Sequence, residues 1–332
     1  MDSHRVLVSG GAGMIGSTLV KRLVEQGDDV AVVDNLWRGK LDYLKGPDGR
    51  YVIDIGRSFF ECDLRTPGVI DHILEGVDHV YHLADVVAGI DYVFGNQGSI
   101  YRSNTLINSN VIDSVRRRRV KGFIYVGTAC SFPADLQTGV DAEPLREQDQ
   151  YPASPESAYG WSKLMGEYEA LLMEQEMQIP VSVLVLHNVY GVPTDLDPAT
   201  SQVIPALVLK AVRWPEEPFV VWGSGDQGRA FVHVDDVVDA LMLSTQYGFG
   251  HGPIQIGPSV CTTIRAIAEA VVRVSGKPIE IHYDVSRPEG DRGRCADFSK
   301  ATAVLGWEPR VDLESGLASL YRWVEGRIGR SG

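Results

Sequence analysis

The sequence predicts an α/β protein in which a doubly wound parallel sheet is followed by a smaller C-terminal lobe. Two observations carry this prediction. Short apolar stretches typical of buried strands alternate with helical stretches as far as residue 187. After Tyr190 the pattern changes, because five prolines interrupt residues 193–218 and only short strands and separate helices follow.

The elements follow one another in a regular order. Strand candidates begin near residues 5, 30, 59, 78, 123 and 181, and the longest helical stretches cover 98–118 and 157–177. They define a first unit at 1–188, to which a strand and helix at 230–250 are expected to return. Residues 189–229 and 251–330 then form the second lobe, with helices near 204–212, 262–275 and 313–328.

A glycine-rich turn links the first strand to the first helix. It contains Gly10, Gly13 and Gly16. Glycines at this spacing permit a tight turn, close approach of the backbone to a pyrophosphate, and close packing of the helix on the strand. Between a strand and a helix, the turn predicts a Rossmann-type dinucleotide site that also includes Met14 and Ile15.

The second strand ends in an acidic residue. Its apolar residues 30–33 lead into Asp34, roughly 20 positions after the glycines. A carboxylate at this place hydrogen-bonds the ribose hydroxyls of an adenosine and repels a 2′-phosphate. Arg38 lies nearby in the chain, but Asp34 favours NAD over NADP.

Two later strand ends fit the same site. Asp63 and Leu64 follow the third strand and are expected near the adenine, while Leu83 and Ala84 end the fourth strand where a dinucleotide must pass. His82, inside that strand, is interpreted as a packed core residue. The predicted cofactor-binding residues are Gly10, Gly13, Met14, Ile15, Gly16, Asp34, Asn35, Asp63, Leu64, Leu83, Ala84, Tyr159 and Lys163.

Tyr159 and Lys163 stand four positions apart in the predicted helix at 157–177, so they share one face of it. A lysine ammonium beside a phenol favours the phenolate and is expected to lower the pKa of Tyr159. Such a phenol can take a proton from an alcohol while hydride leaves the alcohol carbon. Together with the dinucleotide site, the pair indicates redox chemistry at a carbon that bears a hydroxyl.

Composition excludes several classes of protein. The net charge of −13 argues against general nucleic-acid binding, and the basic run at 116–121 is interpreted as a solvated helix end. No stretch reaches the roughly 18 apolar residues of a membrane span, and the N-terminus lacks a signal-peptide pattern. The four cysteines are scattered without zinc-type spacing, so we expect no metal site and a reduced, cytoplasmic setting.

The motifs at 10–16, 128–130 and 159–163, in this order, resemble those of the extended short-chain dehydrogenase/reductase family, and the likeness continues to about residue 328. The resemblance implies that Thr128 is the catalytic hydroxyl, Tyr159 the base and Lys163 its lysine, with NAD as cofactor. It also implies a nucleotide-diphosphate sugar as substrate and a homodimer through the helices at 98–118 and 157–177.

Cys130 narrows the expected reaction. Residues 128–130 read Thr-Ala-Cys, whereas dehydratases of this family have Thr-Asp-Glu. A cysteine here, followed by Pro133, is similar to the family's GDP-mannose 3,5-epimerases and GDP-fucose synthases. Oxidation of a hexose at C4 acidifies the protons on C3 and C5, and a thiolate can remove one of them. We therefore predict that Cys130 is the acid/base of an epimerase that acts on a GDP-mannose-like substrate.

One position departs from this pattern. Gln202 or Val203 falls where those two groups have a lysine or a histidine as a second acid/base. Glutamine cannot usefully donate a proton near neutral pH. Two possibilities therefore stay open. The enzyme inverts a single carbon centre, or water, Lys210 or His187 returns the proton to the substrate. The alternative functions are a UDP-sugar 4-epimerase that does not need Cys130, a reductase similar to GDP-fucose synthase, and a non-catalytic NAD-binding regulator.

The expected diphosphate contacts are basic. Arg287 and Arg294 lie in a segment suited to bidentate phosphate contacts, and Arg229 is a weaker candidate of the same kind. The predicted substrate-binding residues are Gly89, Cys130, His187, Asn188, Gln202, Lys210, Arg287 and Arg294.

Overall fold

The computed structural model describes residues 3–137, 139–287 and 292–329. Its centre is a seven-stranded sheet with the order β11-β6-β5-β4-β1-β2-β3, in which all neighbouring strands are parallel. Its strands are β1 (Arg5–Ser9), β2 (Asp29–Asp34), β3 (Phe59–Glu61), β4 (His79–His82), β5 (Gly122–Thr128), β6 (Val181–Leu186) and β11 (Pro253–Ile256). The predicted α/β fold class is confirmed.

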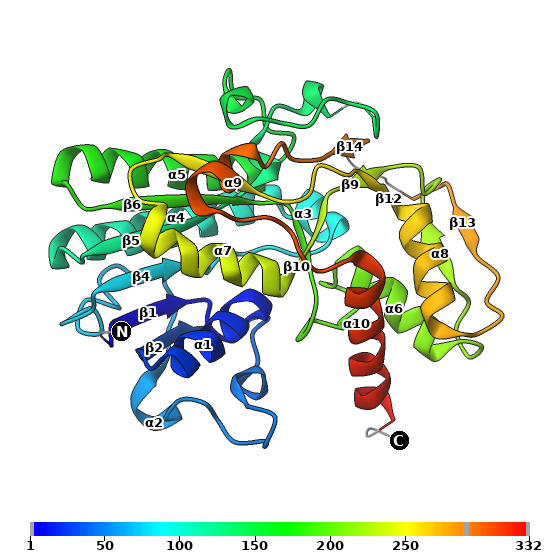
Figure 1. Ribbon diagram of the computed structural model, residues 1–332, viewed down its shortest axis with the longest axis horizontal. Coiled ribbons are helices and arrows are strands. Elements are labelled where there is room, and N and C mark those ends of the chain that lie inside the picture. Colours follow the sequence, from blue (N-terminus) through cyan, green and yellow to red (C-terminus); the bar gives the residue numbers. More distant parts are fainter. Residues whose placement is uncertain (1–2, 138, 288–291, 330–332) are drawn as a thin grey trace.

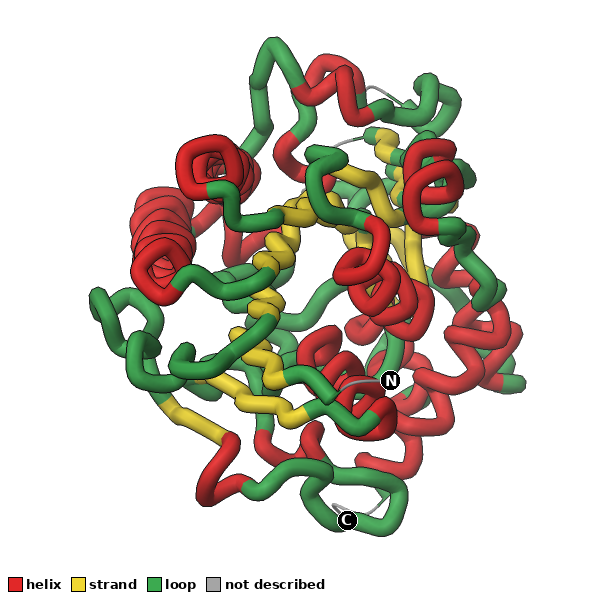
Figure 2. Tube along the Cα trace, turned by 60° about the vertical axis from the view of Figure 1, so that its left-hand side comes forward, coloured by secondary structure: helices red, strands yellow, loops and turns green. Residues whose placement is uncertain are grey.

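Helices cover both faces of this sheet (Figure 2). Successive side chains of a strand point to opposite faces, so in β1 Val6 and Val8 enter one core while Leu7 enters the other. The first core is closed by α1 (Met14–Gln26) and α7 (Val234–Tyr247), and the second by α4 (Gln97–Arg118) and α5 (Ala158–Met177). Burial on both faces explains why the strands read as continuous apolar runs.

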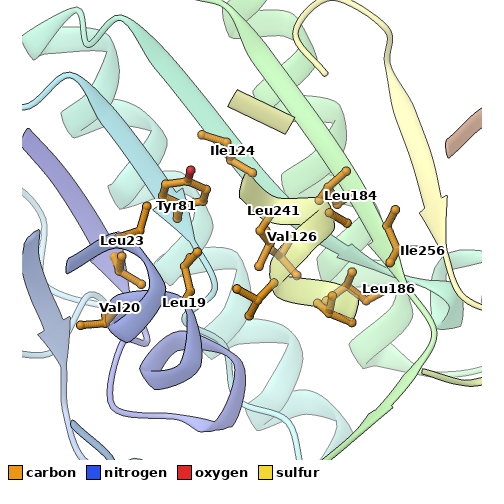
Figure 3. Close-up of a cluster of buried hydrophobic side chains, with 14 of the residues drawn as sticks. Leu19, Val20, Leu23, Tyr81, Ile124, Val126, Leu184, Leu186, Leu241 and Ile256 are labelled. Carbon is orange, nitrogen blue, oxygen red and sulfur yellow. The ribbon is translucent and has the colours of Figure 1, made fainter. Parts of the chain in front are cut away.

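Figure 3 shows the first of these cores. Leu19 and Leu23 of α1 meet Tyr81 of β4, and Leu241 of α7 packs beside the strands from the same side. Full burial of a leucine side chain contributes roughly 1.5–3 kcal/mol. The core therefore fixes the position of α1, and with it the glycine turn that precedes the helix.

The second lobe is a separate layer beside the carboxyl ends of the strands (Figure 1). Its helices α6 (Val203–Arg213), α8 (Ile264–Ser275) and α10 (Leu313–Ile328) share one apolar core. Its short strands pair as β7 (Asn188–Tyr190) with β10 (Phe231–His233), β8 (Val220–Trp222) with β13 (His282–Asp284), and β12 (Thr262–Thr263) with β9 (Gly228–Arg229) and β14 (Gly293–Arg294).

The remaining elements are short. They are α2 (Ile55–Ser58), α3 (Ile90–Gly95), α9 (Ser299–Leu305), and the 3₁₀ turns η1 (Leu41–Leu44), η2 (Ala129–Ser131), η3 (Ala134–Leu136) and η4 (Glu147–Gln150). Of these, η2 matters most for function, because it carries Cys130 directly after β5.

The boundary between the two units differs at one place from the sequence-based division. Residues from 251 onward were expected in the second lobe, whereas β11 forms an edge of the main sheet beside β6. Ile254 and Ile256 are fully buried there, and α9 packs against β11 and α7. An apolar strand with a free sheet edge beside it gains both burial and ladder hydrogen bonds by this pairing.

The basic run lies where the sequence placed it, at the end of α4. Arg116 pairs with Glu176 at 2.9 Å and Arg117 with Asp71 at 2.8 Å, while Arg119 donates to the carbonyl of Met177. These cations thus form contacts at the end of the helix.

None of the helices in the described part of the chain combines the length and the apolar composition that crossing a bilayer requires.

Candidate active site

A large cleft opens at the carboxyl ends of the parallel strands and encloses about 780 Å³. The strand order reverses between β1 and β4, the point at which open α/β sheets bind ligands. The second lobe supplies the opposite wall through α6. The predicted residues that line the cleft are Gly10, Gly13, Met14, Ile15, Gly16, Asp34, Asn35, Asp63, Leu64, Leu83, Ala84, Gly89, Thr128, Cys130, Tyr159, His187, Asn188, Gln202, Lys210 and Arg294.

The glycine turn leaves no room for side chains. Gly10 has a φ of +74°, and a Cβ on it would lie 2.9 Å from the backbone nitrogen of Ala84. A Cβ on Gly16 would lie 2.2 Å from the carbonyl oxygen of Gly10, so α1 starts directly on the turn. The first turn of α1 lines the cleft, and the free N–H groups of a helix N-terminus are suited to bind a pyrophosphate.

Asp34 is fixed at the end of β2. Its carboxylate accepts hydrogen bonds from the N–H groups of Ala12 at 3.0 Å and Leu36 at 2.8 Å. Burial raises the pKa of Asp34, while these backbone donors lower it. Held beside the glycine turn, the carboxylate is in place for ribose hydroxyls. The residues of this half therefore fit a bound NAD.

Tyr159 and Lys163 meet a carboxylate that the sequence analysis did not assign to the site. The Tyr159 hydroxyl donates to Asp85 Oδ2 at 3.0 Å, and Lys163 Nζ lies 3.6 Å from the same oxygen. The expectation that Lys163 lowers the pKa of Tyr159 is wrong for this arrangement. Burial, followed by the charges of Asp85 and Cys130, raises the pKa of Tyr159 well above its ordinary value.

Lys163 does not line the cleft and is buried behind it, with its ammonium 4.8 Å from the ring centre of Tyr125. Burial lowers the pKa of Lys163 and Asp85 opposes that effect. One turn further along α5, burial raises the pKa of Glu167 to about 7, although its carboxylate accepts a hydrogen bond from Gln150. The buried layer beneath the site thus contains an amine and a carboxyl group, and burial opposes the ionisation of both.

Cys130 lies on the cleft wall immediately beside Tyr159. Its N–H donates to Thr128 Oγ1 at 3.2 Å, and its side chain packs against the small cluster that contains Tyr159. Helix α5 can come this close because residue 160 is glycine. A Cβ on Gly160 would lie 2.1 Å from the carbonyl oxygen of Cys130. The predicted catalytic groups are therefore brought together, with Lys163 beneath them.

His82 and His187 are both buried and neutral. His82 hydrogen-bonds to Ser9 and Asn108, and burial lowers its pKa to about 3. His187 lines the cleft, hydrogen-bonds through Nε2 to Gln255 at 3.0 Å, and has its pKa lowered by burial to about 4. His82 is the packed core residue that the sequence indicated.

The basic groups of the second lobe divide into two sets. Arg294 and Arg229 line the cleft from the adjacent strands β14 and β9. Arg287 does not line it, because its guanidinium pairs with Asp284 and lies 5.0 Å from the ring centre of Trp222. The weaker candidate, Arg229, therefore lines the cleft, whereas Arg287 does not. Part of the motif at 288–294 lies outside the described residues.

Lys210 and Gln202 line the cleft from α6. Lys210 donates to the carbonyl of Val220 at 2.5 Å, and its ammonium lies 6.0 Å from the ring centre of Trp222. Gln202 is the N-cap residue of α6, and Gly89 approaches the same segment so closely that a Cβ would lie 2.8 Å from the carbonyl oxygen of Ser201.

Two polar residues of the site had no sequence-based role. Arg38 donates to the carbonyl of Val87 at 2.5 Å and pairs with Asp195 at 3.3 Å, which links three loops around the cleft. Asp85 follows the end of β4, next to the switch point, and this position is the signal that could have identified it.

Among the described residues, no group of three or more His, Cys, Asp or Glu side chains is arranged to hold a metal ion.

The sheet order, the glycine turn and the Tyr–Lys pair define a dinucleotide-dependent enzyme of the short-chain dehydrogenase/reductase type. More narrowly, the chain belongs to the NAD dependent epimerase/dehydratase family, whose model matches residues 6–257. The family is NAD-dependent, which agrees with the fit of the Gly10–Gly16 turn and Asp34 to this cofactor.

Individual relatives belong to the same class. GDP-mannose 3,5-epimerase of Arabidopsis thaliana is 30% identical over 98% of this chain and 84% of its own length. GDP-L-fucose synthase of Escherichia coli K12 is 28% identical over 97% of both chains. The crystal structure of a UDP-glucose 4-epimerase from Thermotoga maritima with UDP-glucose is 27% identical, with a TM-score of 0.86 over 98% of this chain and 99% of that one.

Proposed function

We propose that this NAD-dependent sugar epimerase inverts C3, C5 or both of a GDP-mannose-like nucleotide sugar after transient oxidation at C4. The observation that carries the proposal is the location of Cys130 on the cleft wall, beside Tyr159 and tied to Thr128. A reaction confined to C4 needs no thiol there. The curated relatives that act on GDP-sugars support the same substrate class.

Each residue has a defined part in this reaction. Bound NAD supplies reversible hydride acceptance at C4. Thr128 and Tyr159 orient the C4 hydroxyl, and Tyr159 moves its proton. Cys130 removes the proton on the carbon next to the C4 ketone, where the negative charge that develops is delocalised onto the ketone oxygen. Arg229 and Arg294 bind the diphosphate from the second lobe.

The return of a proton to the opposite face limits the number of inverted centres. Gln202 cannot supply it, His187 is neutral, and Lys210 is engaged with the carbonyl of Val220. We therefore favour inversion of a single centre, with water or a mobile Lys210 as the proton source.

Incubation with GDP-mannose in D2O tests the proposal. Mass spectrometry and proton NMR of the recovered nucleotide sugar should find deuterium at C3 or C5, and Cys130→Ser should abolish this labelling. Unlabelled, unchanged GDP-mannose would contradict the substrate assignment.

A second candidate is a UDP-sugar 4-epimerase, which the glutamine at position 202 favours because this reaction needs no second acid/base. In that case Cys130→Ser would leave activity nearly intact, while Tyr159→Phe would abolish it. A reductase similar to GDP-fucose synthase would consume reduced cofactor in stoichiometric amounts. A non-catalytic NAD-binding regulator would be indicated if Tyr159→Phe changed no sugar chemistry.

The assembly that we propose is a homodimer through α4 and α5. Tyr101 on α4 and Trp161 and Tyr168 on α5 are all exposed, which supports an apolar contact between copies. Light scattering on the purified chain tests it. We also propose a cofactor unit at 1–188 with 230–250, completed by β11 and α9, and a substrate lobe formed by the rest of 189–229 and 251–330. A reduced cytoplasmic setting is proposed in keeping with the four free cysteines.

A further inference from the structure

Asp85 forms a shared contact with both members of the redox pair. One of its oxygens, Oδ2, accepts the Tyr159 hydroxyl at 3.0 Å and lies 3.6 Å from Lys163 Nζ. The side chains of Lys163 and Asp85 are only 1% and 13% exposed. Asp85 also lines the cleft, so its carboxylate stands between the buried lysine and the space for the substrate.

The groups around this contact come from several elements. Three residues surround the hydroxyl of Tyr159. Asp85 comes from the loop after β4, and Thr128 and Cys130 come from the end of β5 and the turn that follows it. Lys163 faces Asp85 and, from its own helix, Glu167, while the neutral His82 lies within reach of its charge. Asp85 and Lys163 therefore form the charged pair next to the phenol, and burial makes that pair sensitive to any proton that Tyr159 gains or loses.

Redox-neutral epimerisation imposes a requirement that a net dehydrogenase does not share. The proton that leaves the C4 hydroxyl during oxidation must return when the hydroxyl is re-formed at the end of the same turnover. A dehydrogenase can release this proton to solvent. An epimerase benefits from a site that keeps it, and that site must be an acceptor already hydrogen-bonded to the tyrosine.

We propose that Asp85 is a positioning residue that receives the phenol proton of Tyr159 and holds it until the C4 hydroxyl is re-formed. In the forward step the O–H bond at C4 breaks and a new O–H bond forms at Tyr159. The former phenol proton moves at the same time to Asp85 Oδ2. In the return step the proton on Asp85 goes back to Tyr159, and the Tyr159 proton goes back to the C4 oxygen.

This role explains an arrangement that otherwise opposes catalysis. A carboxylate beside Tyr159 disfavours the free phenolate, and burial does so too. Direct formation of phenolate is therefore costly at neutral pH. Transfer of the proton to Asp85 avoids a second negative charge beside Lys163, because the proton neutralises the carboxylate that is already there.

The first test needs no substrate. The purified full-length chain is labelled with ¹³Cζ-tyrosine, and Tyr159 is assigned as the resonance absent in Tyr159→Phe. Asp85→Asn retains an acceptor oxygen but removes the charge, so it should lower the pKa of Tyr159 by about 1–3 units. Asp85→Glu should restore it. An unchanged Tyr159 titration in Asp85→Asn would overturn the proposal.

The second test measures turnover against pH and rests on the proposed function. Asp85→Asn should lower kcat about 100-fold at pH 7 and recover towards the wild-type rate as the pH rises through the new Tyr159 pKa. Asp85→Glu should regain a large part of the loss at pH 7. Asp239→Asn on α7, whose ion pair with Arg22 lies outside the cleft lining, is the matched control and should keep the wild-type profile.

The two tests separate the possible failures. If GDP-mannose is not turned over by the wild-type protein, the substrate proposal fails, while the NMR titration still decides whether Asp85 controls Tyr159. If the Tyr159 pKa falls in Asp85→Asn but kcat at pH 7 stays within twofold of wild type, the proton-holding role is overturned. An equal loss in Asp85→Asn and Asp85→Glu at every pH would overturn it as well.

Discussion

The cofactor half of the cleft is built from backbone, whereas the sugar-facing half is built from side chains. Gly10 and Gly16 act by having no side chain, and the first turn of α1 packs directly on the carbonyl oxygen of Gly10. On the other side, the phenol of Tyr159 and the ammonium of Lys163 both contact the carboxylate of Asp85. The first half tolerates almost no added atom, and the second almost no change of charge. Substitutions in the two halves should therefore fail in different ways.

The largest effect is expected in the side-chain half. Tyr159→Phe removes the hydroxyl that moves the C4 proton and should lower kcat by about 10²- to 10⁴-fold. NAD affinity should stay within a few-fold of wild type, because the glycine turn is untouched. Isothermal titration with NAD and the rate of sugar conversion give the two numbers. A parallel loss of NAD binding would remove the distinction between the halves.

In the backbone half, Gly16→Ala places a Cβ 2.2 Å from the carbonyl oxygen of Gly10. We expect NAD to bind about 100-fold more weakly and stability to fall by about 1–3 kcal/mol through overpacking. Titration with NAD and chemical denaturation measure both effects. Gly326→Ala in α10, where a Cβ meets no atom within 4 Å, is the matched control and should be neutral or slightly stabilising.

The charged layer below the side-chain half should reduce stability as the pH rises. The pKa of Glu167 is raised to about 7, so the folded state holds a proton there between pH 4.5 and 7 that the unfolded chain has already lost. Its favourable contribution is therefore present at low pH and lost as pH rises through 7. Glu167→Gln should stabilise the protein by about 3 kcal/mol at pH 8 and by less than about 1 kcal/mol at pH 5.

Urea denaturation of both proteins at the two pH values checks this expectation. A gain that is equal at pH 5 and pH 8 would mean that packing, and not the buried charge, limits stability at this position. A cofactor-half variant such as Gly16→Ala should lose the same free energy at both pH values, because no titrating group is involved.

The smallest effect is expected at the diphosphate. Arg294→Gln should raise the KM for the nucleotide sugar about 10-fold, the value of one charge-assisted hydrogen bond, with little change in kcat. Arg287→Gln should have a smaller effect because its guanidinium lies outside the cleft lining. Arg273→Gln, at an exposed ion pair on α8, is the control. A larger effect at Arg287 than at Arg294 would contradict the assignment of the diphosphate to the residues that line the cleft.

The same contrast explains which features the sequence revealed. The strands near residues 5, 30, 59, 78, 123 and 181, and the Gly10–Gly16 turn, are set by residues adjacent in the chain. Local patterns predict such features well. The edge strand β11 was assigned to the wrong unit because its partner β6 lies about 70 residues earlier, and only the folded sheet brings them together.

Side chains that meet across long sequence separations were harder to predict. Asp85 reaches Tyr159 over a separation of 74 residues. Burial, and after it the charge of Asp85, raises the pKa of Tyr159 instead of lowering it as Lys163 alone would. The position of Arg287 outside the cleft lining has a similar origin, because its guanidinium is held by Asp284 and by the ring of Trp222, which is 65 positions earlier in the chain.

The glycine at position 160 has a practical consequence for anyone who wishes to change the sugar that the enzyme accepts. Helix α5 rests on the carbonyl oxygen of Cys130 without an intervening side chain, so the redox tyrosine and the thiol form one rigid unit. A mutant library that varies residues 128–131 or 157–163 would mostly disturb this unit. Diversity is better placed at Gln202 and Trp222, which line the cleft from the other lobe and can change its shape without moving the reacting groups.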